Sequence, residues 1–460
     1  MTVTNNEELL KRIARLAKQN QELEENIRKL EKINEKLARE NDRINALHKK
    51  LSPGVVREVS LKFNMATVLF ADIHGFSRLI EGLDSSAVMD ELDEIHFEFD
   101  AIARRFKIEK IKTIGDAFMC AGGIPVKNIT NPVEVVMASV EMRNFLEKFE
   151  KNIRGNNSRI WELKIGIHTG PVTAAVSGKK KINYELKGDT VNTANRVEAV
   201  SGKGMILISV MTYELVKEFF DCEYFGKLPV KYKSDLQMYK VIGLKPELST
   251  NREGVLPNES FRIKFGLIQF TDIQEIILDK LEKELPDYLY YHNVKHTVDV
   301  VTEVELIGWG EGCTDEEILI LKTAGLFHDA GHTITYDNHE FFGAQLAREM
   351  LSEFNYTPEQ IERICSIIMA TSLPPKPTNL LENIICDSDL DYLGRSDFIP
   401  VSNTLYEELK AQNKMGSLND WNKIQVKFIS GHQYFTETAR SLREVNKQLQ
   451  IERIQSLITE

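Results

Sequence analysis

A leucine or isoleucine recurs every seven residues through the first 51 residues of the chain. The series comprises Leu9, Leu16, Leu23, Leu30, Leu37, Ile44 and Leu51, and the alternate seam positions hold Ile13, Asn20, Ile27, Asn34, Asn41 and His48. An apolar repeat sustained over about six heptads is typical of a coiled coil. Asparagine at several seam positions favours a pair of parallel helices, because each asparagine amide then pairs with the same asparagine of the other helix. We therefore predict that residues 1–52 form a parallel homodimeric coiled coil; the alternative is one amphipathic helix packed on its own domain.

Length and composition restrict the rest of the chain. The 460 residues suffice for two or three domains, and 42% hydrophobic and 28% charged residues are ordinary for a globular protein. No apolar run has the length of a membrane span, and the N-terminus lacks an apolar signal core, so we expect a cytoplasmic protein with no membrane partner. A formal net charge of −11 argues against a nucleic-acid partner, and any anionic ligand is expected to be small.

A breaker cluster at Ser52-Pro53-Gly54 ends the heptads, and a different pattern follows. The run MATVLFADI (65–73) predicts a strand, residues 86–106 predict a helix, and IEKIKTIGDAFMCAG (108–122) predicts two strands around a tight turn. LKIGIHTGPVTAAVSG (163–178) predicts two more strands. We predict a mixed α/β domain over residues 53–244.

Two aspartates terminate predicted strands in this domain. Asp72 follows the first strand, and Asp116 lies in the turn between the next two. Carboxylates brought together in this way repel each other unless a cation lies between them, and hard oxygen ligands favour Mg²⁺ or Mn²⁺. A metal-bound nucleotide polyphosphate would supply the remaining ligands.

Five segments of this domain resemble the catalytic domain of class III nucleotidyl cyclases. They are FADIHGF (70–76), KTIGDAFM (112–119), GIHTGPV (166–172), KGDTVNTANRVEA (187–199) and VKYKSDLQMY (230–239), in the family's order. The resemblance implies a ferredoxin-like α/β fold and two Mg²⁺ or Mn²⁺ ions held by Asp72 and Asp116. It also implies active sites shared between two catalytic domains, so that a homodimer would carry two equivalent sites.

The same resemblance assigns the substrate contacts. Lys112 stands where members that cyclise ATP carry lysine, and an ammonium donor suits the acceptor N1 of adenine. Glu185 occupies the second base-reading position, where aspartate or threonine is usual. Asn192 and Arg196 would orient the ribose and stabilise charge on the α-phosphate. Lys231, or less well Lys233, would contact the phosphates.

After residue 244 the pattern changes again. Proline, glycine and polar residues predict a linker over 245–262, and residues 263–460 read as almost entirely helical. Three clusters of imidazoles and carboxylates fall on separate helices: YHNVKHTVDV (291–300), LFHDAGH (326–332) and CDSDLDYLG (386–394). Side chains of these types can converge inside a helical bundle as a metal site.

These three clusters resemble the HD superfamily of metal phosphohydrolases, and more narrowly the class I cyclic nucleotide phosphodiesterases. The resemblance implies one or two divalent metal ions. Their ligands would be His296, His328, Asp329 and a late aspartate, either Asp389, which we prefer, or Asp387.

The resemblance extends to residues that would act on the substrate. His292 would be the general acid that protonates the leaving 3′-oxygen, with Asp337 orienting it. In IQVKFI (424–429), Gln425 would bind the purine and Phe428 would stack on it. A helix-face phenylalanine beside a polar residue is equally typical of a packed core.

Together these features predict a bifunctional enzyme. The cyclase domain would convert ATP to 3′,5′-cAMP and pyrophosphate, and the helical domain would hydrolyse cAMP to AMP. Two alternatives remain for the helical domain: hydrolysis of a different phosphorylated substrate, or nucleotide sensing without turnover.

Overall fold

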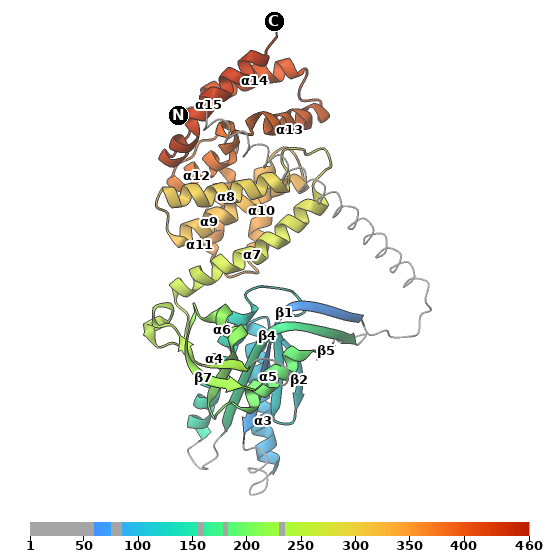
Figure 1. The fold of residues 1–460 in the computed structure, drawn as a ribbon, viewed down its shortest axis with the longest axis vertical. Coiled ribbons are helices and arrows are strands. Elements are labelled where there is room, and N and C mark those ends of the chain that lie inside the picture. Colours follow the sequence, from blue (N-terminus) through green and yellow to red (C-terminus); the bar gives the residue numbers. More distant parts are fainter. Residues whose placement is uncertain (1–58, 75–84, 154–160, 178–182, 230–234, 460) are drawn as a thin grey trace, which may run out of the picture. The chain divides into compact units, whose positions relative to one another are not determined.

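The computed structural model describes residues 59–74, 85–153, 161–177, 183–229 and 235–459. The predicted coiled coil lies outside these residues, as do Lys231 and Lys233. The described parts of 60–175 and 183–460 form one compact unit. This unit contains a β-sheet with its helices and, further along the chain, a bundle of helices (Figure 1).

The first half of the described chain is the mixed α/β domain that the sequence predicts. Its elements are β1 (Val59–His74), α3 (Ser85–Arg105), β2 (Glu109–Ile114), β3 (Ala117–Gly122), α4 (Asn131–Ile153), β4 (Glu162–Ser177), β5 (Asn183–Lys187), α5 (Asp189–Ala199), β6 (Met205–Ser209), α6 (Val210–Val216), β7 (Phe220–Leu228) and β8 (Leu236–Leu244). Among the described residues the sheet has eight strands in the order β2-β3-β1-β4-β6-β8-β7, with β5 paired to β4.

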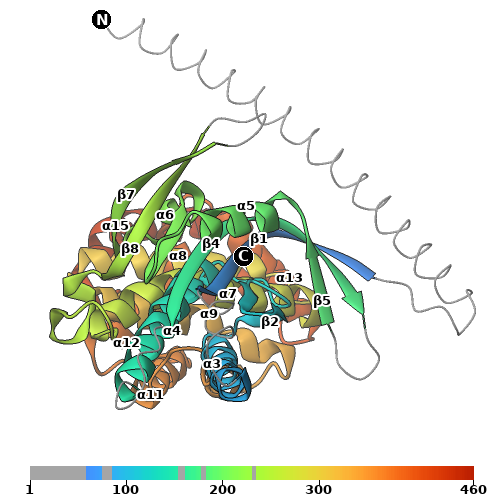
Figure 2. The same cartoon turned by 90° about the horizontal axis from the view of Figure 1, so that it is seen from below.

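Helices cover both faces of this sheet. The larger core lies under α3 and α4, where Phe99, Ile102 and Val136 pack against sheet residues such as Leu69. The opposite face packs against α5 through Ala194 and a smaller apolar cluster. Figures 1 and 2 show α3 and α4 on one side of the sheet and α5 on the other. Alternating apolar residues along the strands thus fill both layers.

One strand differs from the prediction. The sequence predicts two strands in residues 163–178, whereas β4 is one strand that continues through Gly170 and Pro171. The parallel pairing of β4 with β6 covers only Lys164 to Ile167. The N–H that Pro171 lacks therefore interrupts none of the hydrogen bonds between β4 and β6.

The second half of the described chain is helical, as predicted. Its elements are the 3-10 helices η1 (Pro246–Leu248) and η2 (Thr250–Arg252), α7 (Glu259–Glu284), α8 (Val294–Gly310), α9 (Asp315–Phe327), η3 (Ala330–Thr333), α10 (His339–Leu351), α11 (Pro358–Met369), α12 (Leu380–Asp389), η4 (Asp391–Gly394), α13 (Phe398–Ala411), α14 (Leu418–Gly431) and α15 (Glu437–Leu457). The stretch predicted as a linker, 245–262, holds both of the first 3-10 helices and the first turn of α7. None of the described helices is long and apolar enough to cross a bilayer.

Helix α7 belongs to two hydrophobic cores. Phe261 and Phe265, near its N-terminus, pack into the core under α3 and α4. Phe270 and later residues of the same helix pack into the core of the helical bundle. The Asp272 carboxylate also accepts a hydrogen bond of 2.8 Å from the backbone N–H of Ile129. Helix α7 therefore joins the two halves by packing and not only by chain continuity.

We predict that Phe265→Ala lowers the free energy of unfolding by about 3–5 kcal/mol, because it opens a cavity where α7 enters the first core. Phe265 is 5% exposed, whereas Phe97, on α3, is 69% exposed. Phe97→Ala is therefore the matched control and should cost less than about 1 kcal/mol. Urea unfolding of both variants measures the difference. Equal losses would contradict the packing described for α7.

Candidate functional site

The two aspartates predicted to hold metal lie at the ends of adjoining strands. Strands β1 and β3 pair in antiparallel register with Asp72 opposite Ala117. Asp116 immediately precedes β3, and its carbonyl accepts a hydrogen bond of 3.2 Å from the N–H of Ile73. Gly115, with φ of +60°, makes the tight turn between β2 and β3. The turn thus places the second aspartate beside the first.

A cavity of about 310 Å³ opens beside these strands. Asp72, Lys112 and Asn192 all line it, together with Glu198 from α5. Burial, and after it the nearby Asp72 carboxylate, raises the pKa of Glu198 to about 7, and Asp116 adds to this effect. Several carboxylates therefore crowd one wall of the cavity, which is the donor set that Mg²⁺ or Mn²⁺ prefers.

Two other predicted substrate contacts, Glu185 and Arg196, lie elsewhere on the domain surface. Glu185 on β5 is exposed and pairs with Lys187 at 3.5 Å. Arg196 on α5 is also exposed, and its guanidinium donates to the carbonyl of Pro229. Neither Glu185 nor Arg196 is among the described residues that line the Asp72 cavity.

A second polar site lies inside the helical bundle. His296 from α8, His328 at the end of α9, Asp329, and Asp389 at the end of α12 converge there. His296 Nε2 is 3.3 Å from Asp329 Oδ2 and 3.1 Å from Asp389 Oδ1. His328 Nε2 is 3.2 Å from Asp329 Oδ2 and 3.3 Å from His296 Nε2. The bundle therefore brings together the four predicted ligands of the first metal.

The tautomer of His328 suits a metal ligand. Its Nδ1 lies 2.8 Å from the carbonyl oxygen of Gly325, so Nδ1 carries the proton and donates it. Nε2 is then left as the lone-pair atom facing the cluster. Asp329 Oδ2 is buried and makes no hydrogen bond of acceptable geometry. These donors fit a divalent cation at their centre.

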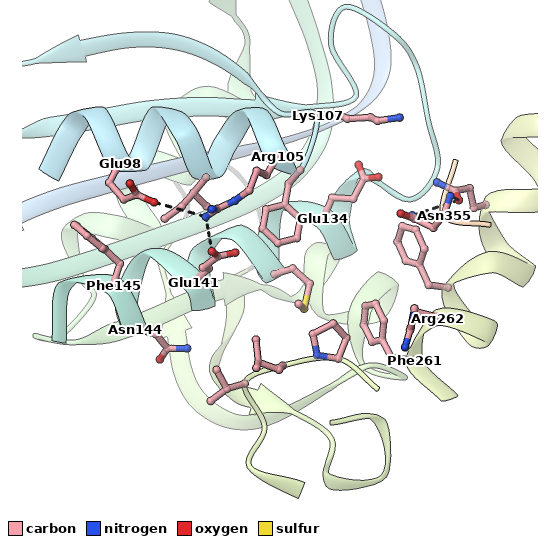
Figure 3. Close-up of a pocket in the computed structure, with 18 of the residues that line it drawn as sticks. Glu98, Arg105, Lys107, Glu134, Glu141, Asn144, Phe145, Phe261, Arg262 and Asn355 are labelled. Carbon is pink, nitrogen blue, oxygen red and sulfur yellow. Dashed lines mark hydrogen bonds and ion pairs between the residues drawn. The ribbon is translucent and has the colours of Figure 1, made fainter. Parts of the chain in front are cut away.

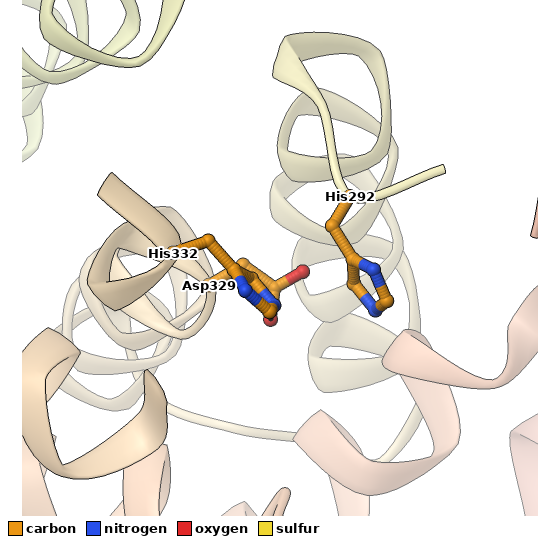
Figure 4. Close-up of side chains that lie close together, drawn as sticks. All are labelled: His292, Asp329 and His332. Atoms are coloured by element: carbon orange, nitrogen blue, oxygen red, sulfur yellow. The ribbon is translucent and has the colours of Figure 1, made fainter. Parts of the chain in front are cut away.

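Asp329 also faces a second group of imidazoles through its other oxygen. Asp329 Oδ1 is 3.4 Å from His339 Nε2 and 4.0 Å from His332 Nε2. Ligand atoms of His292, Asp329 and His332 all lie within 4.8 Å of one another (Figure 4). Both ring nitrogens of His332 are buried without a hydrogen-bond partner among the described residues. One carboxylate thus adjoins two clusters of potential ligands.

The charges in this site depend on protons that the histidines share with the two aspartates. Burial opposes every charge here, yet ion pairs with Asp329 and Asp389 hold the pKa values of His296 and His328 above their usual range. The pKa values of the two aspartates are lowered in return. Burial lowers the pKa of His332 to about 3, so this imidazole is neutral. A divalent cation can replace the shared protons as the positive charge between the carboxylates.

The two candidate aspartates of the late cluster differ in placement. Asp387 points away from the histidines, and its carboxylate accepts hydrogen bonds from the N–H groups of Phe435 and Thr436 and from the Thr436 hydroxyl. These contacts hold the start of α15. Asp389, two residues on, faces the histidines instead.

The residue that holds His292 is not the one predicted. Glu408, on α13, is fully buried, and its Oε1 lies 2.5 Å from His292 Nδ1. Its other oxygen accepts from the N–H groups of Tyr291 and His292. Burial alone would raise the pKa of Glu408, but these hydrogen bonds lower it, so the group is an anion. Asp337 is 82% exposed and pairs with Lys414 instead.

The two residues predicted to contact the purine do not lie in this site. Gln425 is 5% exposed, and its amide donates to the hydroxyl of Ser402, which also accepts from Trp421. Phe428 is 41% exposed, and its nearest aromatic neighbour is His432. Neither Gln425 nor Phe428 lines the cavity of about 290 Å³ that adjoins His296 and Asp389.

Several site residues were missed in the sequence for different reasons. Glu408 lies in an ordinary helical stretch, LYEELK, with no motif to mark it. His332 ends the quoted HDAGH cluster, so its signal was present without being assigned a role. His339 follows seven residues later and could have been noticed by that spacing. Glu198 lies within the quoted KGDTVNTANRVEA segment.

Comparison with known proteins identifies both halves. A family model of the adenylate and guanylate cyclase catalytic domain matches residues 59–243, and a model of the HD domain matches residues 293–392. A membrane guanylyl cyclase from Dictyostelium discoideum is 31% identical over 183 residues, 40% of this chain and 12% of that protein. An adenylate cyclase from Mycobacterium tuberculosis is 32% identical over 184 residues, 40% of this chain and 41% of that protein.

Solved structures match the same region. The guanylate cyclase domain of RhGC from Catenaria anguillulae in complex with GTP is 32% identical, with a TM-score of 0.37, and the match covers 40% of this chain and 100% of that one. The adenylyl cyclase CyaB from P. aeruginosa is 31% identical, with a TM-score of 0.38, and the match covers 40% of this chain and 96% of that one. The chain spans less than half the length of the two curated relatives named above. It carries a catalytic domain of the adenylate and guanylate cyclase type, followed by an HD domain.

Proposed function

We propose that this protein both makes and hydrolyses 3′,5′-cAMP. The cyclase domain would convert ATP to cAMP and pyrophosphate, and the HD domain would open the cyclic phosphate to AMP. The observation that carries the first activity is the cavity shared by Asp72 and Lys112. The second is carried by the convergence of His296, His328 and Asp389 beside His292.

In the cyclase domain, Asp72 and Asp116 would hold two Mg²⁺ or Mn²⁺ ions. Bound there, the ions would supply positive charge to the triphosphate and to the ribose 3′-oxygen as it attacks. The crowding of carboxylates around Glu198 supports this assignment, since a cation relieves their repulsion. Asn192 lines the same cavity and would orient the ribose.

Selection of ATP rests on Lys112. Its exposed side chain extends from β2 at the cavity, where an ammonium can donate to N1 of adenine but meets the N1–H donor of guanine unfavourably. Glu185 would accept a hydrogen bond from the adenine amino group. Relatives named as adenylate and as guanylate cyclases match about equally well, so the overall match does not choose the base.

A complete cyclase site requires a second copy of the chain. Glu185 and Arg196 are exposed on the domain surface and lie outside the described lining of the Asp72 cavity. A partner domain placed against this surface would bring its own Arg196 to the α-phosphate and its own Lys231 to the other phosphates. The predicted coiled coil would raise the effective concentration of that partner.

In the HD domain, His296, His328, Asp329 and Asp389 would hold one divalent ion. Asp329 could share a second ion with His332 and His339, and such ions would activate water and polarise the phosphate. The buried Glu408 carboxylate fixes His292 by binding Nδ1, which leaves Nε2 to carry a proton toward the leaving 3′-oxygen.

We predict that Lys112→Glu shifts the ratio of kcat/KM for ATP over GTP toward GTP by at least about tenfold, because a carboxylate accepts from guanine N1–H and repels adenine N1. Lys110 lies on the same strand, is also exposed, and is not among the residues lining the cavity. Lys110→Glu should leave the ratio unchanged. Chromatography of products from both nucleotides measures it, and equal shifts in the two variants would contradict a base-reading role.

We predict that the wild-type chain, given ATP and Mg²⁺, forms cAMP transiently and then AMP. Asp389→Asn should accumulate cAMP and bind less metal, because it removes an anionic ligand. Asp387→Asn should retain metal and hydrolysis and lose only stability, since Asp387 holds α15. Metal analysis with a product time course distinguishes the two variants. Persistent cAMP in the metal-loaded wild type would instead leave the HD domain as a sensor or as a hydrolase of another substrate.

We predict that Glu408→Gln lowers kcat for cAMP hydrolysis roughly 10- to 100-fold while metal content is retained, because the His292 imidazole loses its anionic partner. Asp337→Asn, on an exposed surface pair, should change kcat less than about twofold. If Asp337→Asn proved the more damaging change, Glu408 would not be the residue that orients His292.

A further inference from the structure

One cavity of the described structure lies outside both proposed catalytic sites. It has a volume of about 540 Å³, within the range of cavities that hold small organic ligands. Its walls come from α3 and α4 of the cyclase domain, from residues 255–257, and from the first turns of α7. The cavity therefore forms where α7 enters the first core.

One part of the cavity wall is apolar and aromatic. Phe145 on α4 and Phe261 and Phe265 on α7 all line it, and the rings of Phe261 and Phe265 stack with centroids 5.8 Å apart. Met137 adds a polarisable side chain. Figure 3 shows Phe145 at one end of the cavity, near Asn144, and Phe261 at the other end, beside Arg262. Aromatic side chains of this kind favour contact with a flat ring.

The charges around the cavity are not balanced locally. Arg105 lies between two acids, 3.7 Å from Glu98 and also paired with Glu141, as the dashed lines in Figure 3 show. Arg262 and Lys148 line the same cavity, and neither has an acidic partner among the described residues. Arg105 with its two acids has one negative charge in excess, and Lys107, which also lines the cavity, offsets it, so Arg262 and Lys148 leave the cavity attractive to an anion.

Glu134, an acid on the cavity wall, reduces the attraction of the cavity for an anion only in part. Glu134 is buried, and its carboxylate already accepts hydrogen bonds from Asn128 at 2.8 Å and from Thr130 at 3.3 Å. Burial raises its pKa to about 7, so a large fraction of this carboxyl is neutral near neutral pH. Glu134 therefore does not cancel the charge of Arg262 and Lys148.

Amide groups complete the lining. Arg262, Gln269 and Asn355 border this cavity and also a smaller neighbouring one, which places them close together. Gln269 is 6% exposed, and its oxygen accepts from Asn355 only through long contacts of 3.4 Å. The Nδ2 group of Asn144 is buried with no partner among the described residues. These amides can exchange weak or missing contacts for hydrogen bonds to a ligand.

We propose that this cavity is a binding site for a small organic anion with a planar ring, of the size and chemistry of a nucleoside monophosphate. The ring would lie toward Phe145 at one end of the cavity, and the anionic group would meet the Arg262 guanidinium beside Asn355 at the other. This site is separate from both catalytic sites, and its occupancy does not depend on the activities proposed above.

The test is equilibrium binding of AMP to the full chain in EDTA. Chelation removes the divalent ions on which both proposed catalytic sites depend, so binding through those ions is suppressed. We expect one AMP per chain, with adenosine alone and inorganic phosphate alone each binding at least about tenfold more weakly. The variants Asp116→Asn and Asp389→Asn should bind AMP as the wild type does, which separates this site from the catalytic ones.

Substitution then locates the site. Arg262→Ala should weaken AMP binding at least about tenfold, because it removes the guanidinium that would pair with the anionic group. Lys127→Ala, an exposed lysine outside the cavity lining, is the matched control and should leave affinity unchanged. A folded Arg262→Ala variant that binds with wild-type affinity would overturn the proposal, as would failure of AMP to bind the wild type in EDTA.

A measurement on the wild type keeps the proposal falsifiable if Arg262→Ala does not fold. AMP should slow hydrogen exchange in residues 137–148 of α4 and in residues 255–269, which comprise the first turns of α7 and the segment before it, because both stretches line the cavity. Unchanged exchange in both segments, at AMP concentrations that saturate the binding curve, would place the ligand elsewhere and overturn the assignment.

Discussion

The whole described structure depends on the packing of one helix, α7, into two cores. Its first turns bury Phe261 and Phe265 in the cyclase domain, and its later turns bury Ile273 and Ile277 in the HD domain. Gly266 marks the change of surroundings, because a Cβ there would lie 2.7 Å from a methyl group of Leu319. A helix fixed at both ends transmits a displacement along its axis, whereas a flexible linker would absorb it.

A second constraint comes from charge buried in the HD domain. Asp329 is 6% exposed, and its two oxygens face two different groups of histidines. Burying a carboxylate destabilises the folded state unless a positive charge lies beside it. Protons shared with imidazoles supply that charge only within a limited pH range. Divalent cations would neutralise the carboxylates more completely, which explains why so many polar side chains are gathered in an otherwise apolar bundle.

The amino-acid sequence predicts those elements whose signals lie in neighbouring residues. The turn at Gly115 lies where the sequence predicts it and brings Asp116 beside Asp72, and the histidine clusters lie together in the bundle. Placement that depends on long-range packing was not accessible: nothing in the residues around Glu408 shows that it lies against His292, 116 positions away. Spacing along the chain also did not decide whether Asp387 or Asp389 is the metal ligand, because that choice depends on the direction that each side chain takes at the end of α12.

If both proposed activities act on cAMP, the net reaction converts ATP to AMP and pyrophosphate, and the cAMP level depends on the ratio of the two rates. A ligand changes that ratio only if it binds two states of the protein with different affinities. Among the described residues, α7 is the helix that contributes buried side chains to both main cores. A state that differs at α7 therefore differs in both domains, and a ligand that contacts this helix is placed to favour one activity over the other.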